Sequence, residues 1–354
     1  MKRVIQTLAA LAVGGAVMAA LVVGVGLYNV SAREGHLPGV RWVLHTTYQQ
    51  SVQLRAPEPK KVPDDIQHPD RVTVGALHFK TACAFCHGLP GQAQSATTQS
   101  MEPPPPHITD AVSGWEAEEL FWIVNEGVKM TGMPHWPAPG REDEVWSVVA
   151  YLNALPDAQA QVALAGEGRE RASCTQCHGE NGNSRNSYIP RLDLLTPGQI
   201  AEALRQYRDG RRESGIMQEA AGLLSDSQIA AMAQKYGSPK APQWQGEEAP
   251  EAETPGALLA QSGNGDVPAC TACHGPGRRA DAPIAPLLAG QSKAYLEGQL
   301  KLWREGKRGG GERSELMRKA AQDLTDDEIA TLVDWYRSSC SSHRSNLYCE
   351  TWGR

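Results

Sequence analysis

Three features that point to common classes of protein are missing from this chain. It has no excess of basic residues, because 34 Lys and Arg stand against 40 Asp and Glu among 354 residues. The resulting net charge of -6 gives no reason to expect binding to nucleic acid. Only three Phe are present, so aromatic content is low. Beyond one apolar stretch near the N-terminus there is no second long apolar run, which excludes a multi-span membrane protein.

Cysteine is scarce outside one signature that occurs three times. Six of the eight cysteines lie in the pattern Cys-x-x-Cys-His, at residues 83–87, 174–178 and 270–274, and Gly follows each copy. On the first turn of a helix this spacing sets both sulfurs along one porphyrin edge, and the next residue points its imidazole at the iron. The pattern therefore predicts three covalently bound haem c groups. The thioether cysteines would be Cys83, Cys86, Cys174, Cys177, Cys270 and Cys273, and the proximal iron ligands His87, His178 and His274.

Two other kinds of site use the Cys-x-x-Cys spacing. A dithiol redox motif has no need of a directly following His. A zinc site needs a second Cys pair nearby, whereas these pairs stand about ninety residues apart, each with its own His. Haem attachment therefore explains the pattern better than either alternative.

The two remaining cysteines, Cys340 and Cys349, lie near the C-terminus. In an oxidising compartment they would form a disulfide that closes a small loop. Free thiols are the alternative.

The N-terminus predicts how the chain reaches such a compartment. After Lys2 and Arg3, the uncharged stretch from Leu8 to Tyr28 has about 21 residues, enough to cross a membrane as a helix. A cleaved signal peptide is the alternative, because small residues at 16–20 offer a cleavage site, but the stretch exceeds the usual signal-peptide core. The positive-inside rule then places everything after Tyr28 across the membrane. We expect a single-pass protein of the bacterial inner membrane with its haem domains in the periplasm.

Repeats two and three share a longer frame around their haem motifs. A Pro stands twelve residues after the motif His in both, at Pro190 and Pro286. A helix is expected at residues 200–207 and 295–303, and Gly stops each one. Capping boxes at Ser225 and Thr325 then start a last helix that ends at Tyr236 and Tyr336.

A methionine precedes that last helix at the same distance in both repeats. Met217 and Met317 each lie nineteen residues before the final Tyr, in what we expect to be a loop. Met232 aligns with Leu332, so it is interpreted as a core residue of the last helix, the usual role of a lone Met. The matched positions predict Met217 and Met317 as the second axial ligands of haems two and three.

The first repeat fits this frame loosely. Pro106 lies nineteen residues after His87, a capping box at 113–116 is expected to open a helix at 118–125, and a last helix is expected at 142–155. Met133 lies eighteen residues before Tyr151, close to the spacing in the other repeats. Met133 is therefore predicted as the ligand of haem one, with Met130, His107 and His135 as alternatives.

Each repeat resembles the class I cytochrome c fold, in which three main helices wrap one haem. Repeats two and three resemble the tandem domains of the bacterial two-haem cytochromes c. Repeat one, with Lys129-Met-Thr-Gly-Met-Pro134, resembles cytochrome domains attached to respiratory oxidases and dehydrogenases. The resemblance also implies that the carbonyls of Pro106, Pro190 and Pro286 accept the Nδ1 protons of the motif histidines.

The implied fold is all-α, with three tandem class I cytochrome c domains after one N-terminal transmembrane helix. Domains of about eighty residues hold marginal cores, so each haem would supply much of the apolar centre as a covalent staple. We expect a signal-anchor at residues 1–30, a juxtamembrane linker at 31–70, haem domains at 71–156, 157–237 and 257–340, a Pro- and Glu-rich linker at 238–256, and a C-terminal tail at 341–354.

His and Met would fill both axial positions of each iron, which favours electron transfer over catalysis. The expected function is a membrane-anchored three-haem relay that passes single electrons between a respiratory donor and an acceptor such as a terminal oxidase. An alternative is the haem subunit of a membrane-bound periplasmic dehydrogenase that delivers electrons to ubiquinone. A haem peroxidase would need one iron with an open position, and this sequence offers a Met for every iron. The expected partners are redox proteins, the inner membrane and a dehydrogenase or oxidase complex, with no nucleic acid.

The motif assignment makes a prediction about haem loading. Changing Cys273 to Ala removes one thioether sulfur, so the third haem should be lost while the other two remain. Mass spectrometry of the purified protein should find two haems per chain, and three haems in this variant would contradict the attachment site.

Overall fold

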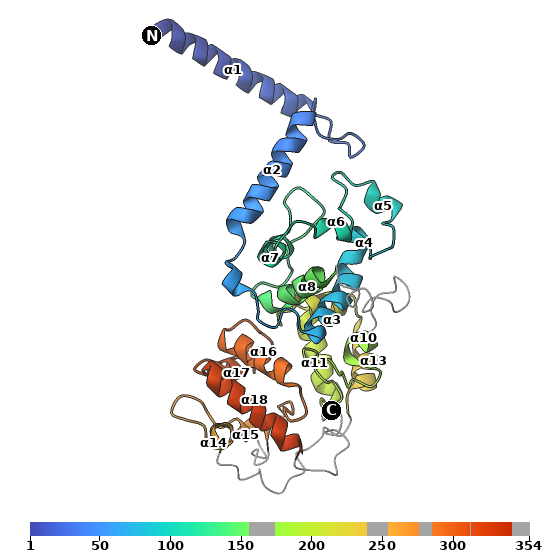
Figure 1. The fold of residues 1–354 in the computed structure, drawn as a ribbon, viewed down its shortest axis with the longest axis vertical. Helices are drawn as coiled ribbons and strands as arrows, with labels where there is room; N and C mark the ends of the chain where they lie inside the picture. The colour runs from blue at the N-terminus through green and yellow to red at the C-terminus, as the bar shows by residue number, and fades with distance from the viewer. Residues whose placement is uncertain (156–173, 239–253, 276–284, 312, 342–354) are drawn as a thin grey trace.

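The computed structural model describes the chain except for residues 156–173, 239–253, 276–284, 312 and 342–354. The described part is all-α, and two isolated β-bridges are its only extended pairing (Figure 1). The predicted fold class is thereby confirmed. The predicted disulfide between Cys340 and Cys349, the C-terminal tail and most of the linker at 238–256 lie outside the described residues.

Two helices, α1 and α2, lie before domain one in the chain. α1 (Lys2–Val25) is long and apolar enough to cross a membrane, and none of its most apolar window is buried. The predicted linker at 31–70 contains a second helix, α2 (Pro38–Arg55), which the sequence pattern did not reveal. α2 contacts domain one through its C-terminal half, where Val52 is buried and the rings of Tyr48 and Trp115 meet at 5.5 Å. Tertiary packing rather than local periodicity therefore stabilises α2.

Domain one begins with a helix that runs into the haem motif. α3 (Pro69–His78) continues through a π-helical turn, η2 (Phe79–Cys83), into α4 (Ala84–His87). Single π-helical turns inside helices occur frequently at functional sites. The other elements are η1 (Pro59–Lys61), α5 (Ala96–Gln99), α6 (Ile108–Ala111), α7 (Ala117–Glu126) and α8 (Glu142–Ala154).

The start of α7 corrects one prediction. The capping box is formed by Glu116 and Glu119, not by Ser113 and Glu116, and Glu119 Oε2 accepts from Glu116 N at 2.9 Å. Gly114 has φ +81, so the chain is still turning at that point and the helix cannot begin at Ser113. The predicted stop at Gly127 is confirmed, with φ +66.

Domains two and three repeat one order of helices, as predicted. The expected helices at 200–207 and 295–303 are α11 (Pro197–Arg208) and α16 (Lys293–Arg304), and both predicted capping boxes are present. The expected loops around Met217 and Met317 are instead short helices. The remaining elements are α10 (Cys174–His178), α12 (Gly215–Ala221), α13 (Asp226–Tyr236), α14 (Pro255–Ser262), α15 (Thr271–His274), α17 (Ser314–Ala321) and α18 (Asp326–Ser341).

Within domain one, and likewise within domain three, two helices cross at a glycine. α3 crosses α8 at Gly75, where a Cβ atom would lie 1.9 Å from the carbonyl oxygen of Ser147. α14 crosses α18 at Gly256 in the same way, with the carbonyl oxygen of Thr331 at 2.1 Å. Real Cβ atoms do not approach backbone this closely, so only glycine allows these helices to approach so far.

The three domains contact one another around Ser187 of domain two. Its N and Oγ donate to Asp70 Oδ2 of domain one at 2.8 and 2.6 Å, and its carbonyl accepts from Tyr295 N of domain three at 3.1 Å. Gln291 and Arg191 exchange two hydrogen bonds between domains three and two, at 2.9 and 2.8 Å. Domains two and three are therefore packed against each other, although the Pro- and Glu-rich linker by itself indicates an extended hinge.

The crossing at Gly256 predicts a stability effect. Gly256→Ala should lower the free energy of unfolding by about 1–3 kcal/mol, because the added methyl group meets fixed backbone. Gly298→Ala in α16 is the matched control, since a Cβ there has open space. Urea unfolding of the full-length variants should separate the two, and equal midpoints would show that the crossing is not tight.

Candidate haem-binding sites

The imidazole of each motif histidine is held by the same kind of backbone bond. In all three repeats Nδ1 lies within hydrogen-bond distance of a proline carbonyl oxygen, and these are the contacts expected from the sequence. The distances are 3.0 Å from His87 to Pro106, 3.1 Å from His178 to Pro190 and 2.9 Å from His274 to Pro286.

This bond fixes the tautomer of each ring. A carbonyl oxygen only accepts hydrogen bonds, so Nδ1 must carry the proton and Nε2 keeps its lone pair. Burial lowers the pKa of His87, His178 and His274, which favours the neutral ring. Neutral imidazole with a free Nε2 is the form that binds iron, and the bond at Nδ1 makes it more electron-donating.

Burial makes one thiol of each motif difficult to ionise. Burial, followed by the other cysteine of the same motif, raises the pKa of Cys83 to about 12 and that of Cys177 and Cys270 to about 11. Reactive dithiol motifs depend on a lowered thiol pKa. The electrostatics of these pairs therefore do not favour a thioredoxin-like reaction.

Two buried tyrosines lie beside the cysteines. The hydroxyls of Tyr151 in α8 and Tyr336 in α18 are buried, and neither has a hydrogen-bond partner in the part of the chain that the structure describes. Leaving such a group unpaired costs about 1–3 kcal/mol. Burial, followed by the nearby Cys83, raises the pKa of Tyr151, and burial, followed by Cys270 and Cys273, raises that of Tyr336, so each tyrosine lies close to a motif. The cysteine pairs and the histidines with a free Nε2 are the donor set of haem c, so the residues present fit that cofactor.

Burial separates the two methionine candidates of domain one. Met130 is 85% exposed and has a left-handed backbone conformation, with φ +63. Met133 is partly buried, and its loop is fixed because its carbonyl accepts from Val128 N and its N donates to Thr131 Oγ1, both at 3.1 Å. The structure thus supports the choice of Met133.

The two histidine alternatives are engaged elsewhere. His107 uses both ring nitrogens, because Nε2 lies 3.0 Å from the carbonyl oxygen of Gln92 and Nδ1 lies 2.9 Å from Thr109 Oγ1. His135 is exposed, and its Nδ1 lies 2.8 Å from the carbonyl oxygen of Trp136. His107 therefore has no ring nitrogen left for iron, and His135 is set apart from the motif histidines by its exposure.

Met217 and Met317 are both partly buried and occupy matching short helices, α12 and α17. Met317 packs against the apolar cluster of domain three together with Cys270. Met232 packs against the core of domain two, which confirms its interpretation as a core residue.

Sequence reasoning missed two arginines at the contact between domains two and three. Arg308 stacks on the ring of Trp303 at 4.4 Å, and Arg212 stacks on Tyr207 at 4.5 Å. Burial, followed by the charge of Arg212, lowers the pKa of Arg308 to about 10. Two partly buried like charges fit a carboxylate ligand, and haem propionates are such groups. The available signal was their shared register, two residues after Gly210 and Gly306.

Comparison with known proteins agrees with this arrangement. Residues 70–152 match the family described as cytochrome c oxidase, cbb3-type, subunit III, and residues 257–339 match the cytochrome c family. The chain is similar to the thiosulfate dehydrogenase electron acceptor of Thiomonas intermedia, with 38% identity over 196 residues, 53% of this chain and 87% of that protein. It is also similar to cytochrome c4 of Thiocapsa roseopersicina, with 34% identity over 176 residues, 48% of this chain and 89% of that protein.

Two solved structures are similar over about half of the chain. Cytochrome c4 of Acidithiobacillus ferrooxidans has 28% identity and a TM-score of 0.38, and the match covers 47% of this chain and 97% of that one. The thiosulfate dehydrogenase of Marichromatium purpuratum has 32% identity and a TM-score of 0.39, with 49% and 39% covered. The family matches and the similarity to the curated relatives show that the chain belongs to the class I c-type cytochromes. These are electron carriers with covalently bound haem c.

The contrast between the two methionines of domain one is testable. Met133→Ala should lower the potential of one haem and remove about one third of the iron–sulfur charge-transfer absorption, because thioether ligation raises the potential. Met130→Ala is the matched control and should change neither. A redox titration with the opposite result would assign the ligand to Met130.

Proposed function

We propose that this cytochrome is a membrane-anchored relay of three haems that takes single electrons from a periplasmic donor and passes them to a respiratory acceptor such as a terminal oxidase. The observation that carries the proposal is the threefold repetition of one ligand arrangement. Each repeat combines a Cys pair, an imidazole whose Nε2 is left free by a proline carbonyl, and a partly buried Met.

Each of these residues has one role in the relay. When bound, each haem supplies a one-electron iron couple. The six motif cysteines hold the haems covalently, and the motif histidines bind the irons through Nε2 while the proline carbonyls fix the rings. With the haems bound, Met133, Met217 and Met317 would be the sulfur ligands of the irons, which would exclude substrate and keep the potentials high. Arg212 and Arg308 bind propionate carboxylates at the contact between domains two and three.

The contacts between the domains support an order for the relay. Domain two contacts domain one at Ser187 and α12, and contacts domain three at Ser187, Arg191 and Gln291. Domain one also contacts domain three, but at the half-exposed ion pair of Glu142 and Lys307, so we place haem two in the middle. Domain one matches an oxidase-subunit family, and a relative similar to more than one domain of this chain accepts electrons from a dehydrogenase. The match of domain one supports exit there, and electrons would then enter from the side of domain three.

A second candidate function has a specific observation in its favour. Two curated relatives bear the name thiosulfate dehydrogenase electron acceptor, at 38% and 32% identity. The same chain would then be the haem subunit of a membrane-bound periplasmic dehydrogenase that delivers electrons to ubiquinone, with a reduced sulfur compound as the primary reductant. The two functions differ in the acceptor.

Membrane anchoring belongs to both candidates. α1 meets the length and composition of a spanning helix, although a signal sequence near the N-terminus meets the same test. The apolar stretch is longer than a usual signal-peptide core. We therefore assign α1 as an uncleaved anchor in the bacterial inner membrane, with the haem domains in the periplasm.

Carbon monoxide tests the electron-carrier role. The purified full-length protein, reduced with dithionite, should bind no carbon monoxide because all three irons have two protein ligands. Met217→Ala opens one iron and is the positive control, which should bind the gas at one haem. Ready binding by the unchanged protein would contradict the relay and favour a peroxidase-like open site.

Reoxidation separates the two candidate functions. In membranes, the reduced haems should be reoxidised by oxygen through a terminal oxidase, and cyanide should block this step. Reoxidation by added ubiquinone in the presence of cyanide would favour the dehydrogenase subunit instead.

A further inference from the structure

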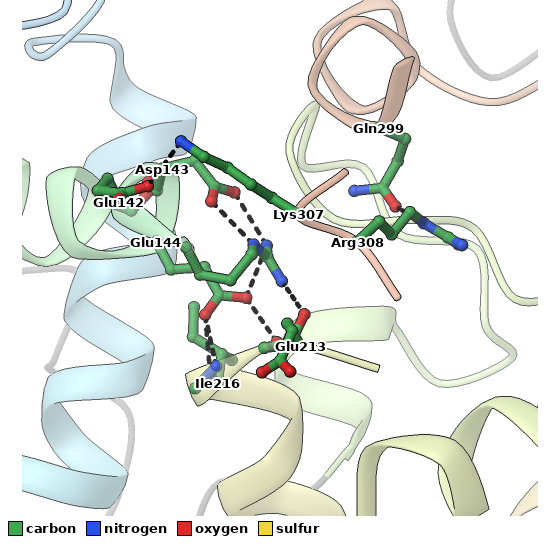
Figure 2. Close-up of polar contacts among 12 residues, drawn as sticks. Glu142, Asp143, Glu144, Glu213, Ile216, Gln299, Lys307 and Arg308 are labelled. Carbon is green, nitrogen blue, oxygen red and sulfur yellow. Dashed lines mark hydrogen bonds and ion pairs between the residues drawn. The ribbon is translucent and has the colours of Figure 1, made fainter. Parts of the chain in front are cut away.

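The helix that carries Met217 rests on side chains of domain one. Figure 2 shows Glu144 of α8 directed at the start of this helix near Ile216. Ser214 Oγ donates to Glu144 Oε1 at 2.5 Å, and Gly215 N donates to Oε2 at 2.7 Å. Ile216 N donates to the same Oε2 at 3.3 Å. One carboxylate of domain one thus holds the three residues that directly precede Met217.

Arg141 holds this carboxylate in place. Its Nη2 lies 2.8 Å from Glu144 Oε1, and the two residues are only 8% and 6% exposed. Its Nη1 donates to the carbonyl of Glu213 in domain two at 2.5 Å, and its Nε donates to Asp143 Oδ1 at 2.8 Å. A buried carboxylate must be paired to remain charged. Here both members belong to domain one, and each also forms a hydrogen bond to domain two.

Apolar contacts complete the same interface. A Cβ atom on Gly215 would lie 2.5 Å from Cε2 of Trp136, so the indole ring fits directly against this backbone. Ile216 packs against the apolar cluster of domain one. Trp136 lies three residues after Met133, so the segments that carry the proposed Met ligands of haems one and two touch each other.

We propose that Glu144 is a positioning residue for Met217, so that domain one sets the sulfur ligation and the potential of haem two. This rests on the proposed role of Met217 as the ligand of haem two. Ser214 connects the carboxylate to the ligand residue, because its Oγ also accepts a hydrogen bond from Met217 N at 3.0 Å. α12 has only seven residues, too few to form a stable helix alone. The hydrogen bonds from domain one therefore decide where the sulfur lies.

The experiment uses full-length protein with Met133→Ala and Met317→Ala, so that the iron–sulfur absorption reports haem two alone. In this background Glu144→Gln loses the charge that binds Arg141 and the α12 backbone. Hydrogen bonds to a charged group are worth about tenfold or more in an equilibrium constant, so the absorption should fall below about half and the potential of haem two should drop, while the haem content stays unchanged.

Glu142→Gln is the matched control for this change. Glu142 lies on the same helix and contacts Lys307 Nζ of domain three at 3.2 Å (Figure 2), and it is 45% exposed. The absorption should equal that of the background. If Glu144→Gln matches this control in both absorption and potential, the positioning role is wrong.

Two further variants separate a wrong ligand assignment from a wrong positioning role. Met217→Ala in the same background should abolish the absorption, and if it does not, the ligand assignment fails rather than the positioning. If Glu144→Gln does not assemble, Ser214→Ala removes the hydroxyl between the carboxylate and Met217 N without leaving a buried charge unpaired. A weaker absorption in Ser214→Ala supports the proposal, and an unchanged one contradicts it.

Discussion

The hydrogen bond between the Nδ1 proton of each motif histidine and a proline carbonyl is the constraint on which the sites depend. It joins the haem-motif segment to the following loop, at His87 and Pro106 in domain one and at the matching pairs in domains two and three. It fixes the tautomer, so that Nε2 keeps a lone pair with which it can bind iron. A Cys-x-x-Cys-His segment without this bond would still attach haem, but the orientation of the ring would be left free.

The second organising feature is close contact between small helical domains. Domains of about eighty residues bury little apolar surface. These three bury more surface where helices cross at glycines and where the domains contact one another. Gly75 and Gly256 allow backbone-to-backbone contact within domains one and three, and Ser187 connects all three domains. A relay benefits from this construction, because electron transfer needs centres held at fixed distances.

The interface at Glu144 links these two features. A buried ion pair at a domain interface costs desolvation energy, which its hydrogen bonds must offset. Such a pair is weak evidence for stability alone, but it specifies one orientation of the partners. Glu144 and Arg141 fix the start of α12, and that helix carries the proposed ligand of haem two. Domain one thereby contacts, through α12, the segment that carries the proposed ligand of haem two.

The sequence by itself determined the chemistry and the helical order, because both depend on local spacing. Cys-x-x-Cys-His, the prolines that follow, the glycine stops and the capping boxes at Ser225 and Thr325 are short-range patterns that hold in any context. Local patterns failed where neighbours decide: α2 depends on packing at Val52, Glu116 replaces Ser113 as the cap, and Met217 lies on a helix rather than in a loop. Only the tertiary structure could bring Glu144 to Ser214 or Arg212 near Arg308, since these pairs are far apart in the chain and their meeting depends on how whole domains pack.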